Sequence, residues 1–243
     1  GEGVLQGDGG ADGQTIAPVP DLAQFGHPGH VQHLLEALVL LGDPQADVGA
    51  AGHHLRLRVA RAQLEQPAAY FLENVRGLYS HDEGRTFAEI KRVLTKELGY
   101  SLFEFVVRAS DYGLPQHRPR LFMVGFKDNS IEFAAPAKRD LAFTMSDVFG
   151  APTEKTIGYT LRVGGKRSGI NDRRNWDGYM VNGEVRRIGP KEGLKMQGFP
   201  SAFEFPVSET AAMKQLGNSV AVWAVQAFAE QIVKSLESAR VTR

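Results

Sequence analysis

The chain has 243 residues with 28 basic and 28 acidic side chains, and 42% of its residues are apolar, enough to build a hydrophobic core. No apolar run approaches 18 residues and the N-terminus lacks the features of a signal peptide, so we expect a cytoplasmic protein without a membrane span. The chain has no cysteine, which excludes disulfides, thiolate metal sites and a thiol nucleophile supplied by this chain.

The balanced charge total hides an uneven distribution. Residues 1–66 carry a net charge of −5, and residues 67–243 carry +5. Residues 155–187 alone hold eight basic and three acidic side chains, so the whole excess lies in this segment. Such a basic patch can bind phosphates or can be a solvated loop, and charge alone leaves both readings open.

Residues 1–58 differ from the rest of the chain. They are rich in Gly, Ala, His and Pro, with no lysine and a single aromatic residue. Their glycine-rich stretch lacks the spacing of a nucleotide-binding loop and favours a flexible tail. His27, His30 and His33 are spaced by three, but a proline and a glycine break the helix that would align them, so no metal site is predicted.

Alternating strands and helices begin near Val59. Residues 68–75 form an apolar run that is typical of a buried strand. A helix is expected over residues 86–98, where Thr86 and Glu89 have the spacing of a capping box.

Two further strands are expected over residues 101–109 and 120–126. Strand, helix, strand and strand in this order indicate the second half of an α/β sheet, which we place at residues 59–150. Glycine, asparagine and charged residues dominate the next segment, so residues 151–200 are expected to form a small, mostly β domain.

The end of the chain has clear turn and helix signals. Asn182-Gly183 predicts a tight β-hairpin, and Pro190 is expected to open a short helix. A long final helix is expected from Asn218, as its N-cap, to Ser235. We expect residues 201–243 to form helices that return to the α/β domain.

Four stretches resemble, in family order, the later motifs of the cytosine-5 DNA methyltransferases. They are FLENV (71–75), DYGLPQHRPRLFMVGF (111–126), RRIGPKEGLKMQGFP (186–200) and QLGNSVAV (215–222). The resemblance covers residues 59–236. It implies a partial S-adenosylmethionine-dependent methyltransferase sheet of Rossmann-like α/β type, with a small target-recognition domain. It also implies double-stranded DNA as the substrate and a role in the DNA methylation of restriction-modification systems.

The resemblance assigns a catalytic site. The family adds a cysteine thiolate to C6 of a cytosine flipped out of the duplex, and a carboxylic acid at N3 assists the addition. Glu73, at the end of an apolar run, is implied as that acid, and a helix-capping or turn-capping glutamate is the alternative. In the motif formed by Gln116, Arg118 and Arg120, the last arginine is implied to hold the base and the carboxylate. Arg118 is assigned to the same site with a mainly architectural role, Gln116 to DNA contacts, and a surface salt bridge is the alternative.

The resemblance also implies a donor site and a DNA surface. Asn218, Ser219 and Val220 are expected to contribute to S-adenosylmethionine binding, because an exposed helix N-terminus can bind the donor's carboxylate. A simple helix cap explains Asn218 equally well. The basic segment corresponds to target recognition, and its expected DNA contacts are Arg162, Lys166, Arg167, Arg173 and Arg174.

Two motifs of the family are missing. Its Pro-Cys loop and its first glycine-rich donor loop precede the Glu-Asn-Val motif, and neither occurs in residues 1–58. We therefore expect that this chain alone does not methylate DNA. It is a truncated or frameshifted product, one subunit of a split methyltransferase completed by a second polypeptide, or a non-catalytic DNA-binding relative. Half a parallel sheet would also expose an unpaired strand edge, so we expect the chain to be poorly stable or to associate.

Overall fold

A computed structural model describes residues 37–40, 66–164 and 167–241 of the chain. The expectations for the histidines and the glycine-rich stretch of residues 1–58 lie outside the described residues. One short strand from that segment is described, β1 (Ala37–Leu40).

The apolar strands form a four-stranded mixed sheet in the order β1-β2-β4-β3. The strand β2 (Ala69–Val75) pairs in parallel with β1 and antiparallel with β4 (Pro119–Phe126), and β3 (Phe103–Arg108) pairs antiparallel with β4. The strands β2, β3 and β4 were predicted from the sequence. The expectation of half a parallel sheet is wrong in detail, because only β1 and β2 are parallel and β2 is paired on both sides.

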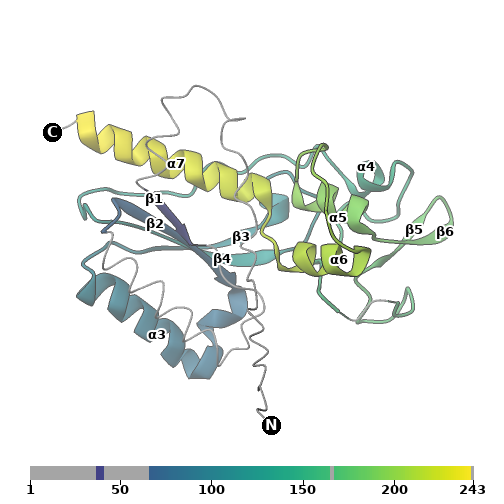
Figure 1. The fold of residues 1–243 in the computed structure, drawn as a ribbon, viewed down its shortest axis with the longest axis horizontal. Coiled ribbons are helices and arrows are strands. Elements are labelled where there is room, and N and C mark those ends of the chain that lie inside the picture. The colour runs from purple at the N-terminus through teal and green to yellow at the C-terminus, as the bar shows by residue number, and fades with distance from the viewer. Residues whose placement is uncertain (1–36, 41–65, 165–166, 242–243) are drawn as a thin grey trace, which may run out of the picture.

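Helices cover both faces of the sheet (Figure 1). The helix α7 (Val222–Val241) lies on one face, and α3 (Arg85–Arg92) lies on the other and continues into a π-helical turn. Because side chains alternate along a strand, β2 supplies Phe71 to the α7 face and Leu72 to the α3 face. Phe71 and Phe122 pack on Phe228 of α7, with ring centroids 5.9 and 5.0 Å away.

The predicted capping box of α3 is wrong. The N-cap is Gly84, whose φ of 83° is left-handed, and Arg85 is the first helical residue. Thr86 is therefore already inside the helix, where its Oγ1 bonds to Nδ1 of His81 at 2.8 Å. Glu89 instead pairs with Arg92 at 2.8 Å.

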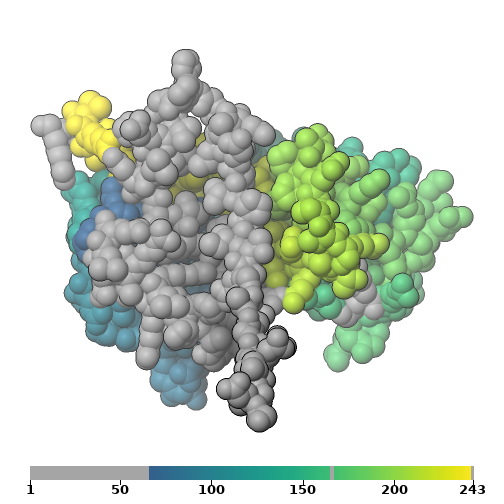
Figure 2. Space-filling view, viewed as in Figure 1, coloured from purple at the N-terminus to yellow at the C-terminus, as the bar shows by residue number. Residues whose placement is uncertain are grey.

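A small domain stands beside the sheet (Figures 1 and 2). It contains α4 (Met145–Phe149), β5 (Gly178–Val181), β6 (Glu184–Arg187), α5 (Pro190–Gln197) and α6 (Glu209–Asn218). The predicted hairpin is confirmed, since the two residues of its turn, Asn182 and Gly183, have φ of 51° and 81°. Pro190 opens α5, as the sequence predicted.

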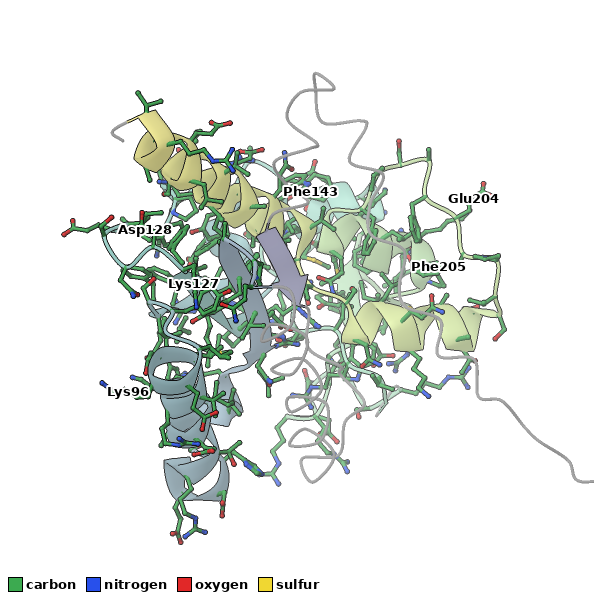
Figure 3. The ribbon with its side chains drawn as sticks, turned by 60° about the vertical axis from the view of Figure 1, so that its left-hand side comes forward. Lys96, Lys127, Asp128, Phe143, Glu204 and Phe205 are labelled. Carbon is green, nitrogen blue, oxygen red and sulfur yellow. The ribbon has the colours of Figure 1, made fainter. Side chains whose placement is uncertain are left out.

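The packing of side chains gives the small domain a different boundary from the one that its composition predicted. Its hydrophobic cluster includes Met145 and Leu216, with Phe143 packed against it, so α6 belongs to the small domain and, of the last two helices, α7 is the one that packs on the sheet. Phe143 lies where the two bodies meet, between Lys127 and Asp128 on the sheet side and Glu204 and Phe205 on the far side (Figure 3).

The final helix does not begin at Asn218. That residue ends α6, the chain is extended at Ser219, and α7 begins at Val222. The expected N-cap is therefore wrong, because Asn218 is the last residue of one helix and not the residue before the next. None of the helices in the described residues combines the length and apolar content needed to cross a membrane.

Candidate active site

Glu73 and Arg120 form a buried ion pair at the end of the sheet. Strand alternation places Glu73 two residues after Phe71, and Arg120 two residues before Phe122, so both side chains lie on the α7 face. Arg120 Nε lies 2.9 Å from Glu73 Oε1, and the two side chains are only 14% and 8% exposed. A carboxylate that would be costly to bury alone is thus paired with a cation.

Arg120 keeps part of its guanidinium available. Its Nη1 donates to the carbonyl of Pro119 at 2.9 Å, and its Nε faces Glu73. Among the described residues, Nη2 makes no hydrogen bond. Burial lowers the pKa of Arg120, and the Glu73 carboxylate acts in the opposite direction. The pair therefore offers a hydrogen-bond donor beside a carboxylate.

Arg118 points into the junction between the sheet and the small domain. Its side chain is 1% exposed, its Nη1 donates to the carbonyl of Leu161 at 3.1 Å, and its Nη2 donates to those of Gly217 and Ser219 at 2.9 and 2.6 Å. Its Nε is buried without a partner. Burial lowers the pKa of Arg118 to about 9, with Arg120 acting in the same direction and Glu73 opposing. These contacts match an architectural role.

Gln116 is also part of this junction. It is fully buried, its Nε2 donates to Oε1 of Gln197 at 3.1 Å and to the carbonyl of Met196 at 3.2 Å, and its Oε1 accepts from the amide of Leu161 at 3.0 Å. The predicted DNA contact does not fit a side chain with no exposed surface. Gln116 instead joins the strand β4 region to the small domain.

The expected donor-binding residues form the turn between α6 and α7. The Oγ of Ser219 accepts from Gln197 Nε2 and donates to the carbonyl of Leu216, both at 2.9 Å. Ser219 therefore does not fit a direct side-chain contact with S-adenosylmethionine. Asn218 and Val220 are half-buried, and Val220 packs against the cluster under α7.

Arginines of the small domain lie at its surface. Arg162, Arg167 and Arg173 are exposed, and their guanidinium groups make no ion pair within the described residues. Arg174 pairs with Asp172 at 2.7 Å, and this hydrogen-bonded partner lowers the pKa of Asp172 to about 2. The positive charge of Arg174 is thus largely offset. Lys166 lies outside the described residues.

Two polar side chains were missed by sequence reasoning. Gln197 is fully buried and donates to the carbonyl of Leu216 at 2.9 Å in addition to its bonds with Gln116 and Ser219. Asp177, 1% exposed, binds Arg187 Nη1 at 3.0 Å. Nothing in the sequence distinguishes Asp177 from the other two acids of the basic segment, or Gln197 from a surface glutamine.

A family model described as C-5 cytosine-specific DNA methylase matches residues 53–166 and 152–234. The chain belongs to this family. The match starts close to Val59, where the composition changes, and it includes Glu73, Arg120 and the basic segment. The predicted family is therefore confirmed.

The chain is similar to several Type II methyltransferases over part of their length. It is 36% identical to M.HpaII of Haemophilus parainfluenzae over 220 residues, which cover 70% of this chain and 62% of that protein. It is 35% identical to M.SsoII of Shigella sonnei over 209 residues, which cover 72% of this chain and 55% of that protein. The chain thus spans between half and two thirds of the length of these relatives.

Solved methyltransferases share the fold. Entamoeba histolytica methyltransferase EhMeth has a TM-score of 0.59 at 14% identity, covering 86% of this chain and 80% of that chain. S. pombe Dnmt2 methyltransferase has a TM-score of 0.58 at 15% identity, covering 84% and 78%. The predicted fold class, a partial methyltransferase α/β domain with a small second domain, is confirmed.

Proposed function

We propose that this C5-cytosine methylase chain binds a cytosine extruded from duplex DNA and supplies the base-binding part of a cytosine-5 methyltransferase site. The buried Glu73–Arg120 pair, 2.9 Å apart, carries the proposal. A cytosine presents an amino group and the acceptors N3 and O2 on one edge. Glu73 can engage N3 and the amino group, while Arg120 Nη2 can donate to O2.

The pair suits the chemistry that C5 needs. Addition of a thiolate to C6 forms a carbon–sulfur bond and moves the electron pair of the C5–C6 double bond onto C5, with charge spread to N3 and O2. Glu73 in its protonated form can donate its carboxyl proton to N3, and the Arg120 guanidinium can donate to O2, so the two groups stabilise this charge without reorganisation. S-adenosylmethionine supplies the methyl group when bound. Because these 243 residues contain no cysteine, the thiolate has to be supplied from outside them, and we expect no methyl transfer by these residues alone.

The donor is proposed to bind beside the base at the turn between α6 and α7. Arg118 donates to the carbonyls of Gly217 and Ser219, and its charge is close enough to Glu73 and Arg120 to affect its pKa. Arg118 thus links the turn to the strand that carries Arg120, which supports donor contacts by the half-buried Asn218 and Val220.

The small domain is proposed to bind the DNA duplex. Arg162, Arg167 and Arg173 are exposed on one domain and make no ion pair with the residues that the structure describes, which suits contacts to phosphates. The ion pair of Arg174 with Asp172 makes it a weaker contact than the other three.

A chimera tests the proposal directly. Residues 59–243 of this chain are joined to the part of M.HpaII that lies outside its match, and transfer of labelled methyl groups to duplex DNA is measured. We expect transfer by the chimera and none by this chain alone. Glu73→Gln should abolish transfer, whereas Glu104→Gln should retain it, because Glu104 pairs with Lys91 on the opposite face of the sheet. An inactive chimera, or an active Glu73→Gln variant, would refute the proposal.

A second candidate is a DNA-binding protein without catalysis. The absence of cysteine together with the exposed arginines favours it. It requires salt-sensitive binding to duplex DNA by the isolated chain with no donor present, and no gain of methyl transfer in the chimera.

A further inference from the structure

Three consecutive buried side chains hold one loop of the small domain. The loop comprises residues 162–164 and 167–174, and we name it the arginine loop. Trp176 Nε1 donates to the carbonyl of Gly164 at 2.9 Å, and Asn175 Nδ2 donates to that of Ile170 at 3.2 Å. Both carboxylate oxygens of Asp177 accept from the amide of Arg167 at 3.2 Å. Asn175 is 6% exposed, and Trp176 and Asp177 are each 1% exposed.

The entrance of the arginine loop is fixed as well. Leu161 donates its amide to Gln116 and accepts at its carbonyl from Arg118. Gly217 packs so closely that a Cβ there would lie 2.7 Å from the carbonyl carbon of Arg162 and 2.8 Å from the amide nitrogen of Val163. The loop is therefore built on the same junction that carries Arg118.

Arg167 stands at the most constrained point of this loop. Its φ of 68° lies in the left-handed region, which a residue with a side chain adopts only when its surroundings impose it. Asp177 imposes it by binding the Arg167 amide and Arg187 Nη1, while Arg187 Nη2 donates to the carbonyl of Ser168 at 3.1 Å. The backbone is thus fixed, yet the side chain is exposed.

The other arginines of the loop are placed differently. Arg174 is paired with Asp172. Arg173 is exposed, and within the described residues none of the buried trio Asn175, Trp176 and Asp177 binds its backbone. A phosphate contact tolerates an adjustable side chain, whereas reading a base edge requires a backbone held in one position.

We infer that Arg167 is a specificity-determining residue that reads a guanine through paired hydrogen bonds to O6 and N7 in the major groove. Guanine is the base that the planar fork of an arginine matches. Asn175, Trp176 and Asp177 act as positioning residues. The inference rests on the proposed function, since it requires that the small domain binds duplex DNA.

Selection from a library of random DNA duplexes tests the inference with the full chain. The wild type should enrich a sequence that contains a required guanine. Arg167→Ala should lose the preference at that one position by roughly tenfold to a hundredfold. Arg167→Lys keeps the charge, so its salt dependence should stay close to that of the wild type. Arg173→Ala should weaken binding to all duplexes alike and enrich the same sequence as the wild type.

The outcomes separate the inference from the proposed function. If the wild type shows no salt-sensitive DNA binding, the proposed function fails and the inference fails with it. If the wild type binds DNA without sequence preference, the inference alone is refuted. Retention of the guanine preference by Arg167→Ala would show that another group reads that base and would also refute the inference.

Discussion

Arg118 should be the residue on which the attachment of the two domains depends most. Arg118→Met keeps the length and apolar stem of the side chain but removes its donors to three carbonyls, those of Leu161, Gly217 and Ser219. A buried carbonyl left without its donor costs about 1–3 kcal/mol. Because relaxation and water entry satisfy part of the loss, we expect a total of about 3–5 kcal/mol, similar to breaking other buried charged networks.

Urea denaturation measures this loss. Arg118→Met should lower the unfolding midpoint strongly, or separate the unfolding of the small domain from that of the sheet. The matched control is Arg162→Met, since Arg162 is exposed and its replacement should change the free energy of unfolding by no more than about 0.5 kcal/mol. An Arg118→Met variant within about 1 kcal/mol of the wild type would show that the three carbonyl contacts do not hold the junction.

Two further predictions concern the small domain. Gly217→Ala should destabilise the chain by about 1–3 kcal/mol, because its Cβ would meet the backbone of residues 162–163. Gly164→Ala should have little effect, because no atom of the described residues lies within 4 Å of a Cβ added there. Equal melting temperatures for the two variants would contradict this prediction. Arg174→Ala should raise the pKa of Asp172 from about 2 toward 3.8, as followed by carboxyl NMR, and an unchanged value would contradict the ion pair. Since the folded pKa is the lower one, this pair stabilises the fold above about pH 4 and its contribution is lost as the pH falls through about 2.

Local signals predicted the parts of the fold that depend on few residues. The alternation in β2, β3 and β4, the turn at Asn182-Gly183 and the start of α5 at Pro190 are confirmed. Two local predictions failed for physical reasons. The expected capping box at Thr86 is absent because the left-handed Gly84 is the N-cap of α3. The expected cap at Asn218 failed because this residue ends α6 and the chain is extended at Ser219.

The site was only partly readable from the sequence. The family resemblance implied that Glu73 and Arg120 share a site, and the structure brings their side chains to 2.9 Å. The inward direction of Gln116 and the buried network around Gln197 depend on contacts between residues about 80 positions apart. No local pattern encodes such contacts. Gln116, which was expected to contact DNA, therefore proves to join the β4 region to the small domain.

The central claim is that the Glu73–Arg120 pair receives an extruded cytosine. Binding should be compared for two duplexes that differ only in one base pair, a matched C·G pair or a C·A mismatch. A site that takes the base out of the stack binds the mismatch more tightly, because less unpairing energy opposes extrusion.

We predict that the wild-type chain binds the mismatched duplex about tenfold more tightly or better, since unpairing costs a few kcal/mol. Glu104→Gln should keep this preference, whereas Glu73→Gln should bind both duplexes equally. Equal affinity of the wild type for the two duplexes, or a preference that survives in Glu73→Gln, would contradict the account.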